Sequence, residues 1–193
     1  MVGHVECLRQ VGAPGNWKAG LIDLAPVLAP AVCEFGADIP GADAPHYLPA
    51  MAADQGVERT LDATLFVPYT QDARAHLRPV HFRADIANVN RCVGTLLGHE
   101  VTKAHPEGLP DGAITIDCDG SAGQSFGAFL PAGVTLNVRG DANDYFGKGL
   151  SGGVVSVRPP EGATFKFDEN IIVGNVAFYG ATGGRGFANG LAG

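Results

Sequence analysis

The sequence predicts a mainly β fold: a right-handed parallel β-helix, a solenoid with coils of about 20 residues, preceded by a short helical connecting region. Two observations predict it. From Gly120 to Gly193 the chain holds 17 of its 28 glycines but only 3 of its 13 prolines, so its two halves differ in local structure. From about Val80, short runs of alternating apolar residues follow one another, each bounded by glycine or proline, which is typical of strands.

The first part of the chain, residues 1–79, is expected to be the helical connecting region. Apolar residues recur every four positions at Val57, Leu61 and Leu65, which marks one face of a helix. Proline does not continue a helix, so Pro68 and Pro79 are expected to end this region. The expected elements are a helix over Trp17–Leu28, a loop over Ile39–Pro45, a helix over Asp54–Phe66 and a helical turn near Gln71–Leu77.

The second part, residues 80–193, is expected to form the Gly-rich β-helix domain, truncated at its C-terminal end. Its strands are predicted in VHFRADI, ITIDC, VTLNVRG and VVSVRP, which begin at Val80, Ile114, Val134 and Val154. A repeat supports this prediction, because seven of 19 positions are identical when residues 120–138 are laid on residues 140–158. Each coil of such a repeat buries its apolar face only when its neighbours stack on it.

A third copy of the repeat follows if residues 158–169 form an inserted loop. Tyr179-Gly180 then falls on Phe146-Gly147, and Gly186-Phe187 falls on Gly153-Val154. In this alignment the glycines mark the corners of the coils, where positive φ and close approach are needed. The aromatic residues predict a column of stacked rings, made of Phe126, Phe146 and Tyr179.

Several motifs resemble functional sites, and each has a structural alternative. Residues 147–152 contain the string GxGxxG, but a dinucleotide-binding turn needs a strand before it and a helix after it, whereas GVVSVRPP follows here. We interpret these glycines as coil corners and Lys148 as a solvated corner. Ser125 lies in GQSFG, which matches GxSxG, but this motif carries a nucleophile on a strand-to-helix turn and the repeat places Ser125 at a coil position.

The sequence contains no motif typical of a metal site or of a reactive cysteine pair. Asp141, Asn143 and Asp144 lack the Glu that closes a calcium-binding EF-hand loop, and we interpret them as turn residues. The histidines form no HExxH motif; they are His4, His46, His76, His81, His99 and His105. The cysteines form no CxxC pair and are interpreted as reduced thiols, with Cys118 at an ordinary strand position; they are Cys7, Cys33, Cys92 and Cys118.

The overall charge excludes some classes of partner. The net charge is −7, which argues against binding nucleic acid or an anionic membrane. No stretch approaches the 18 or so apolar residues of a spanning helix, and the start MVGHVECLRQ is too polar for a signal peptide. We therefore expect a cytoplasmic or plastid-stromal protein that binds no nucleic acid and no membrane.

Two long segments carry a resemblance to a known family. GSAGQSFGAFLPAGVTLNVRGDANDYFGKGLSGG, residues 120–153, closely resembles the carboxy-terminal Gly-rich (GXGXG) domain of the glutamate synthase large subunit, and ENIIVGNVAFYGATGGRGFANGLAG, residues 169–193, continues the resemblance. NVNRCVGTLLGHEVTKAHPEGLPDGAITI is similar to the region where the first coils of that domain begin. The segments WKAGLIDLAPVLAP and DQGVERTLDATLF are more loosely similar to the helical connection after the family's flavin domain.

The resemblance implies a function for the parent enzyme and a supporting role for this chain. In the family, a glutaminase domain releases ammonia from glutamine, and a flavin (synthase) domain with FMN and an iron-sulfur cluster joins it reductively to 2-oxoglutarate to give glutamate. The chain would be the non-catalytic β-helix segment of this oxidoreductase, inactive alone and packed against those two domains, with a small subunit or ferredoxin as a further partner. The resemblance carries over no catalytic, cofactor-binding or metal-binding residue.

Other readings stay open at this point. The chain could be a stand-alone β-helix interaction module, or a β-helix subunit of another redox complex such as formylmethanofuran dehydrogenase. A nucleotide-binding protein that uses residues 147–152 is a third reading.

Overall fold

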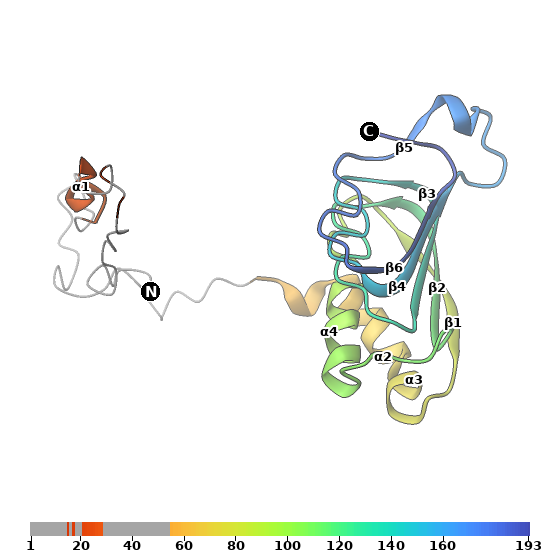
Figure 1. Cartoon of the computed structure of the whole chain (residues 1–193). Coiled ribbons are helices and arrows are strands. Elements are labelled where there is room, and N and C mark those ends of the chain that lie inside the picture. The colour runs from red at the N-terminus through yellow and green to blue at the C-terminus, as the bar shows by residue number, and fades with distance from the viewer. Residues whose placement is uncertain (1–14, 16, 18–20, 29–54) are drawn as a thin grey trace, which may run out of the picture. The chain divides into compact units, whose positions relative to one another are not determined.

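The computed structural model describes residues 15, 17, 21–28 and 55–193 (Figure 1). The chain divides into two compact units, Met1–Gln55 and Gly56–Gly193. In the first unit, helix α1 spans Ala25–Leu28, at the end of the helix predicted over Trp17–Leu28. The loop predicted over Ile39–Pro45 lies outside the described residues. All further description concerns the second unit.

The second unit begins with short helical turns. A 3-10 turn, η4 (Val57–Arg59), precedes a π-helical turn, η5 (Asp62–Phe66), which runs directly into α2 (Val67–Tyr69) and is followed by α3 (Gln71–His76). Pro68 does not end this region as predicted, because the helical backbone continues through it: Pro68 lies in α2, directly after the π-helical turn η5. Leu61 and Leu65 pack against the core as their spacing indicated, whereas Val57 is exposed.

The strands form one sheet in which every pairing is parallel. Its order is β1-β2-β3-β4-β6, and β5 pairs with β3 and β7. All four predicted strands are confirmed. The strands are β1 (Val80–Ile86), β2 (Ile114–Ala122), β3 (Val134–Ala142), β4 (Ser151–Arg158), β5 (Ile171–Val173), β6 (Gly183–Ala188) and β7 (Leu191–Ala192).

The strand register confirms the first half of the predicted repeat and corrects the second half. Gly120 pairs with Gly140 and Ala122 with Ala142, as the 20-residue alignment requires. Between β3 and β4 the register is one residue shorter, because Leu136 pairs with Val155. A slip of one residue exchanges the faces of a strand, so this register is the one that keeps Val155 in the core.

The core combines strands, turns and helices. Strands β2 and β3 alternate buried and half-buried positions, as expected for a sheet with one covered face. Phe66 and Ala73 from the helical turns belong to the same buried cluster as the inward-facing residues of these strands. Figure 1 shows α2, α3 and α4 gathered beside one end of the sheet.

The predicted fold class is therefore wrong. The described residues form a parallel sheet with helices before and between its strands, an α/β arrangement, and not a mainly β solenoid behind a helical connection. The decisive element is α4 (Thr95–Ala104), a ten-residue helix that connects β1 to β2 and buries Leu97 and Val101. Local alternation and glycine spacing predict parallel strands, but they do not reveal that helices cover the sheet.

Candidate functional site

The Gly-rich motifs lie in three turns that stack on one another, residues 123–130, 143–150 and 174–181, here called the stacked turns. Backbone hydrogen bonds join them. The N–H of Ser125 donates to the Asp144 carbonyl at 2.9 Å, and the N–H of Tyr145 donates to the Asn175 carbonyl at 3.0 Å. The N–H of Gly149 donates in the same way to the Tyr179 carbonyl at 2.8 Å. Each turn therefore satisfies the backbone groups of its neighbour.

Equivalent positions of the stacked turns share an unusual backbone conformation. Ser125, Tyr145 and Val176 all have positive φ, at 64°, 60° and 60°. The third turn thus follows the second after 31 residues, the separation of the hydrogen-bonded pair Asp144 and Asn175. The predicted third copy is wrong by two residues, since Phe178 and not Gly180 lies at the position of Gly147.

The three glycines of the GxGxxG string have no free space beside them. A Cβ on Gly147 would lie 2.7 Å from Cδ1 of Phe178, and a Cβ on Gly149 would lie 2.5 Å from Cδ1 of Phe129. A Cβ on Gly152 would lie 2.8 Å from the backbone nitrogen of Ala132. The space that a dinucleotide-binding turn leaves for pyrophosphate is filled here by the chain's own atoms.

The backbone donors of the same segment are also occupied. The N–H of Gly147 donates to the Phe126 carbonyl at 2.8 Å, and the N–H of Lys148 donates to the Tyr145 carbonyl at 3.1 Å. The next element is strand β4 and not a helix. This segment therefore lacks both the free N–H groups and the helix N-terminus that bind phosphate. These glycines, which the sequence interpreted as coil corners, lie in the turns before β4 and are packed against the chain's own atoms.

The predicted aromatic column exists in part. Phe126 and Phe146 are fully buried and stack with ring centroids 6.0 Å apart and an interplanar angle of 4°. The third ring on Phe146 is Phe178, at 5.7 Å in an edge-on arrangement. Tyr179 is exposed and contacts the ring of Tyr145 instead. The column is structural, since it fills the interior of the stacked turns.

The other residues singled out in the sequence serve local structure. Lys148 lies with its Nζ 5.2 Å from the ring centroid of Tyr145, so it is half-buried over an aromatic face and not a solvated corner. Asn143 accepts from the N–H of Asp144 at 2.7 Å, and Asp144 accepts from the N–H of Asn175 at 2.8 Å, as expected of turn residues. The chain after Ser125 continues through a turn into β3, without the helix of a nucleophile turn.

The described histidines and cysteines are dispersed. His81 Nε2 lies 2.9 Å from Asp117 Oδ2, and His105 Nε2 lies 2.7 Å from the Arg74 carbonyl. Burial raises the pKa of the Cys118 thiol to about 12, and neighbouring aspartates add to this shift. Cys118 occupies a strand position as predicted, and Cys92 is exposed. Within the described ranges no three His, Cys, Asp or Glu side chains are placed to hold a metal ion.

His4, His46, Cys7 and Cys33 lie outside the described residues. In the described part of the chain no helix is long and apolar enough to cross a membrane.

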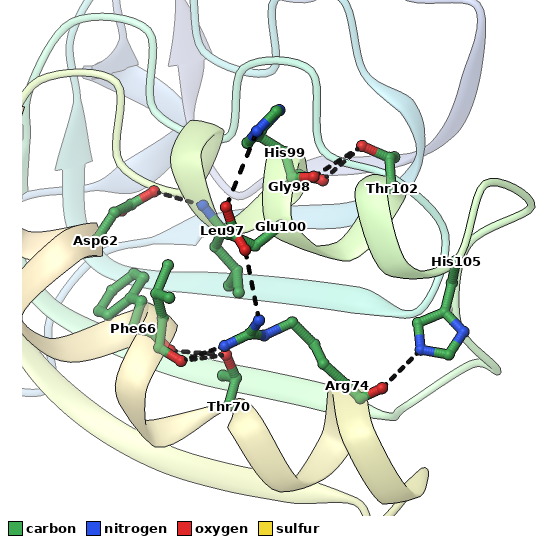
Figure 2. A network of polar contacts seen from close by, with 11 residues as sticks. Asp62, Phe66, Thr70, Arg74, Leu97, Gly98, His99, Glu100, Thr102 and His105 are labelled. Carbon is green, nitrogen blue, oxygen red and sulfur yellow. Dashed lines mark hydrogen bonds and ion pairs between the residues drawn. The ribbon is translucent and has the colours of Figure 1, made fainter.

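Asp62 has a role that the sequence did not reveal. Its side chain is buried and accepts from the N–H of Gly94 at 2.8 Å, at the start of α4. It also accepts from the N–H of Leu97 at 3.0 Å (Figure 2). Burial raises the pKa of Asp62, while the hydrogen bonds from Gly94, Leu97 and Leu96 act in the opposite direction. A carboxylate from η5 thus satisfies the free N–H groups that begin a helix more than thirty residues later.

A second set of contacts joins α3 to α4 (Figure 2). The guanidinium of Arg74 donates to the Val67 carbonyl at 2.7 Å and lies 3.7 Å from the carboxylate of Glu100. The Arg74 carbonyl meets His105 at the other end of α4. These contacts, with Asp62, fix the helices as one layer. No local sequence pattern predicts them, because their partners lie far apart in the chain.

A cavity of about 260 Å³ lies beside the start of α4. The carboxylate of Asp62 lines it, but its hydrogen bonds are already directed to the helix. Among the described residues, the buried side-chain nitrogens without a hydrogen bond are Nε of Arg74 and Nε of Arg139, although Nε of Arg139 lies 2.6 Å from Asp119 Oδ1, and neither residue lines this cavity. The cavity is lined by Val57, Thr60, Leu61, Asp62, Arg91, Cys92, Val93, Thr95, Leu96 and His99.

Comparison with known families agrees with the Gly-rich geometry. Residues 63–193 match the family model described as GXGXG motif, which covers the stacked turns and the whole sheet. The chain belongs to the GXGXG motif family. Its resemblance to glutamate synthases is confirmed by relatives that match over its full length.

Relatives of this GXGXG chain are much longer proteins. The chain is 40% identical over 197 residues to the glutamate synthase [NADPH] large chain of Bacillus subtilis, covering all of this chain and 12% of the relative. It is 43% identical over 197 residues to the glutamate synthase [NADH] of Saccharomyces cerevisiae, covering all of this chain and 9% of that protein. The chain thus spans about a tenth of the length of these curated relatives.

The relatives differ in the electron donor that their names give. The ferredoxin-dependent glutamate synthase 2 of Synechocystis is 42% identical over 132 residues, which are 68% of this chain and 8% of that protein. NADPH, NADH and ferredoxin enzymes therefore match this segment at similar identity. The GXGXG segment does not discriminate between the donors.

Proposed function

We propose that the chain is a non-catalytic scaffold segment of a glutamate synthase, the enzyme that reductively transfers the amide nitrogen of glutamine to 2-oxoglutarate and gives glutamate. The observation that carries this proposal is the filled geometry of the stacked turns. At Gly147, Gly149 and Gly152 the space that a side chain would need is occupied by Phe178, Phe129 and the Ala132 backbone, so these glycines serve packing within the chain. The choice of glutamate synthase as the parent enzyme rests on the similarity of the full chain to glutamate synthases.

The partners of this scaffold are the glutaminase and flavin (synthase) domains of the parent enzyme, with a small subunit or ferredoxin as a further partner. FMN and an iron-sulfur cluster belong to the parent enzyme. The described residues do not fit the cluster, because the Cys118 thiol is buried with a strongly raised pKa and iron-sulfur clusters need thiolates. We assign no catalytic, cofactor-binding or metal-binding residue to this chain, and we place it in the cytoplasm or the plastid stroma.

A segment exchange tests the proposal. In the Bacillus subtilis large chain, the segment that matches this chain is replaced by this chain, and glutamate formation from glutamine and 2-oxoglutarate is measured with NADPH. We expect a chimera that folds and retains activity, while the purified chain alone forms no glutamate with NADPH, NADH or ferredoxin. Glutamate formation by the chain alone, or a well-folded chimera without activity, would overturn the proposal.

The nucleotide-binding reading has its own test. Calorimetry with NAD(P) or flavin is expected to show no saturable heat, because the N–H groups of Gly147 and Lys148 are bonded to carbonyls of the chain. A Gly147→Ala variant is the matched control, since it perturbs the same turn. Binding by the unmodified chain that this variant abolishes would restore the nucleotide reading.

A further inference from the structure

Asn189 and Gly190 form the connection between β6 and β7. They are the one Asn-Gly pair in the sequence. They lie in a bend, and Asn189 is exposed while Gly190 is half-buried. An asparagine followed by glycine is the pair most open to attack by its own backbone, because glycine has no side chain to shield the peptide nitrogen.

The hydrogen bonds around this pair leave its reactive groups free. The N–H of Asn189 donates to the Val157 carbonyl at 2.9 Å, and the N–H of Leu191 donates to the Asn170 carbonyl at 3.0 Å. Between these two anchors, the N–H of Gly190 has no hydrogen bond to any described residue. The side-chain amide of Asn189 likewise has none within the described part of the chain.

Packing requires the glycine of this pair. A Cβ on Gly190 would lie 2.6 Å from Cγ1 of Ile172, whose side chain is only 3% exposed. Ile172 is part of the buried core and cannot move aside cheaply. The fold therefore keeps an unshielded peptide nitrogen beside an exposed asparagine.

We infer that Asn189 is a site of spontaneous deamidation in the folded chain. The backbone nitrogen of Gly190 attacks Cγ of Asn189, the Cγ–Nδ2 bond breaks, and ammonia leaves with the proton of the Gly190 nitrogen. Water then opens the cyclic imide. Addition at Cγ gives aspartate, and addition at the backbone carbonyl gives isoaspartate, with no oxidation or reduction in either step.

The isoaspartate product changes the backbone and not only the charge. It inserts an additional methylene into the main chain between β6 and β7. The N–H of Leu191 then no longer has the register that meets the Asn170 carbonyl, and the bond from the Gly193 N–H to the Val173 carbonyl at 2.9 Å weakens with it. The pairing of β7 with β5 is the element that this modification loosens.

Mass spectrometry of the aged chain tests the inference. The purified full chain is kept in mildly alkaline buffer, and samples are digested with trypsin at mildly acidic pH. Cleavage after Arg185 releases residues 186–193, in which isoaspartate is measured by mass and by isoaspartyl methyltransferase. We expect conversion within about tenfold of the rate of the free peptide GFANGLAG, because opening an exposed edge segment costs little.

Two controls make the result specific. The tryptic peptide of residues 167–185 contains Asn170 and Asn175, which precede Ile171 and Val176, and it is expected to stay unchanged. An Asn189→Gln variant keeps an amide at the site and is expected to stop the conversion. An unchanged 186–193 peptide in the folded chain, over a time in which the free peptide converts fully, would show that the fold protects the site and would overturn the inference.

Discussion

Glycines in neighbouring strands approach so closely that a side chain cannot fit between them. A Cβ on Gly140 would overlap the carbonyl oxygen of Gly120, its partner in the parallel register. This contact involves two backbones, and neither can turn away as a flexible side chain could. Glycine is therefore the residue at position 140 that fits without a steric clash. The sequence repeat, which aligns Gly140 with Gly120, reflects this close approach of the two strands.

A pair of alanine substitutions tests this requirement. We expect Gly140→Ala to lower the free energy of unfolding by more than about 3 kcal/mol, because the strands must separate to admit the methyl group. Gly162→Ala is the control: Gly162 also has positive φ, at 84°, but nothing lies within 4 Å of its Cβ position, so the loss is about 1 kcal/mol. Urea unfolding of both variants gives the comparison, and equal losses would contradict the steric argument.

Asp62 is a second residue whose role is set by its surroundings. We expect Asp62→Ala to cost about 1–3 kcal/mol of unfolding free energy, because the N–H groups of Gly94 and Leu97 lose their buried acceptor. Asp72→Ala, in the exposed first turn of α3, is the control and is expected to change little. Similar losses in the two variants would show that Asp62 does not hold α4.

The raised pKa of Asp62 gives a pH dependence with a defined sign. The folded chain holds the Asp62 proton to a higher pH than the unfolded chain, whose value is near 3.8. The stabilising contribution of Asp62 is therefore fully present below the unfolded pKa and declines as the pH rises through the folded pKa. In urea titrations, the difference in unfolding free energy between the unmodified chain and Asp62→Ala is expected to become smaller as the pH rises from below the unfolded pKa to above the folded pKa of Asp62. A difference that grows over this pH range would contradict the raised pKa.

At the scale of elements, a row of polar side chains crosses three strands on the outer face of the sheet. Asn137 of β3 donates to Asp117 of β2 at 2.9 Å and accepts from Ser156 of β4 at 2.7 Å. Burial acts to raise the pKa of Asp117, but the hydrogen bonds from Asn137 and His81 and the charges of His81 and Arg139 outweigh it, and the pKa is lowered. The row links the strands by side chains where the sheet is not covered.

Removing the central residue of this row has a measurable effect. In Asn137→Ala we expect the pKa of Asp117 to rise and the unfolding free energy to fall by about 1–2 kcal/mol, because two hydrogen bonds are lost. Because a lowered pKa stabilises above the unfolded value, this loss is greatest near neutral pH and shrinks as the pH falls. NMR titration of the Asp117 carboxyl measures the shift. Ser156→Ala, which leaves the bond to Asp117 intact, should not move it.

Elements differed in how well the sequence predicted them. Strand β1 was predicted at its observed bounds, because apolar and polar residues alternate in VHFRADI, which directly follows Pro79. Helix α4 was missed, since its residues were interpreted as the region where the first coils of the family's domain begin, and the side chain that caps it, Asp62, lies in another element. The register of β4 was misjudged by one residue, because repeat identities do not reveal which side chain faces the core.

At the scale of the whole molecule, residues 56–193 share one core across helices and strands. Phe66 is fully buried in the same cluster as Ile116 and Val138. The predicted division of the chain into residues 1–79 and 80–193 stays a prediction, and this shared core shows how to test it. The fold class was misjudged because the glycine pattern reports only local structure. The burial of Phe66 depends on contacts with strand residues that lie far from it in the sequence.

Two truncations examine the division. A chain of residues 56–193 is expected to unfold cooperatively with the stability of the full chain, because its core is complete. A chain of residues 80–193 loses Phe66 and Ala73 and is expected to be less stable by at least about 3 kcal/mol. Equal unfolding free energies of the two truncations in urea would instead support a boundary at residue 79.

The candidate site could be judged from the sequence only in outline. The strand after GxGxxG was enough to argue against nucleotide binding, and the structure adds why, since Phe178 and Phe129 occupy the spaces beside Gly147 and Gly149. The identity of those rings was not predictable, because the third turn follows the second after 31 residues and not after the predicted 33. The additional residues between β4 and β5 change the spacing of the repeat, so the third turn cannot be aligned by a constant offset.

That insertion, between β4 and β5, makes the molecule convenient to engineer. The chain leaves the sheet at Arg158 and returns at Ile171, and the turns on either side stay in hydrogen-bonded contact despite the longer route. Gly162 lies in this excursion with open space around it. An epitope or a fluorescent label placed there would extend a detour that the sheet already accommodates, and would report on the assembled protein without touching its glycine contacts.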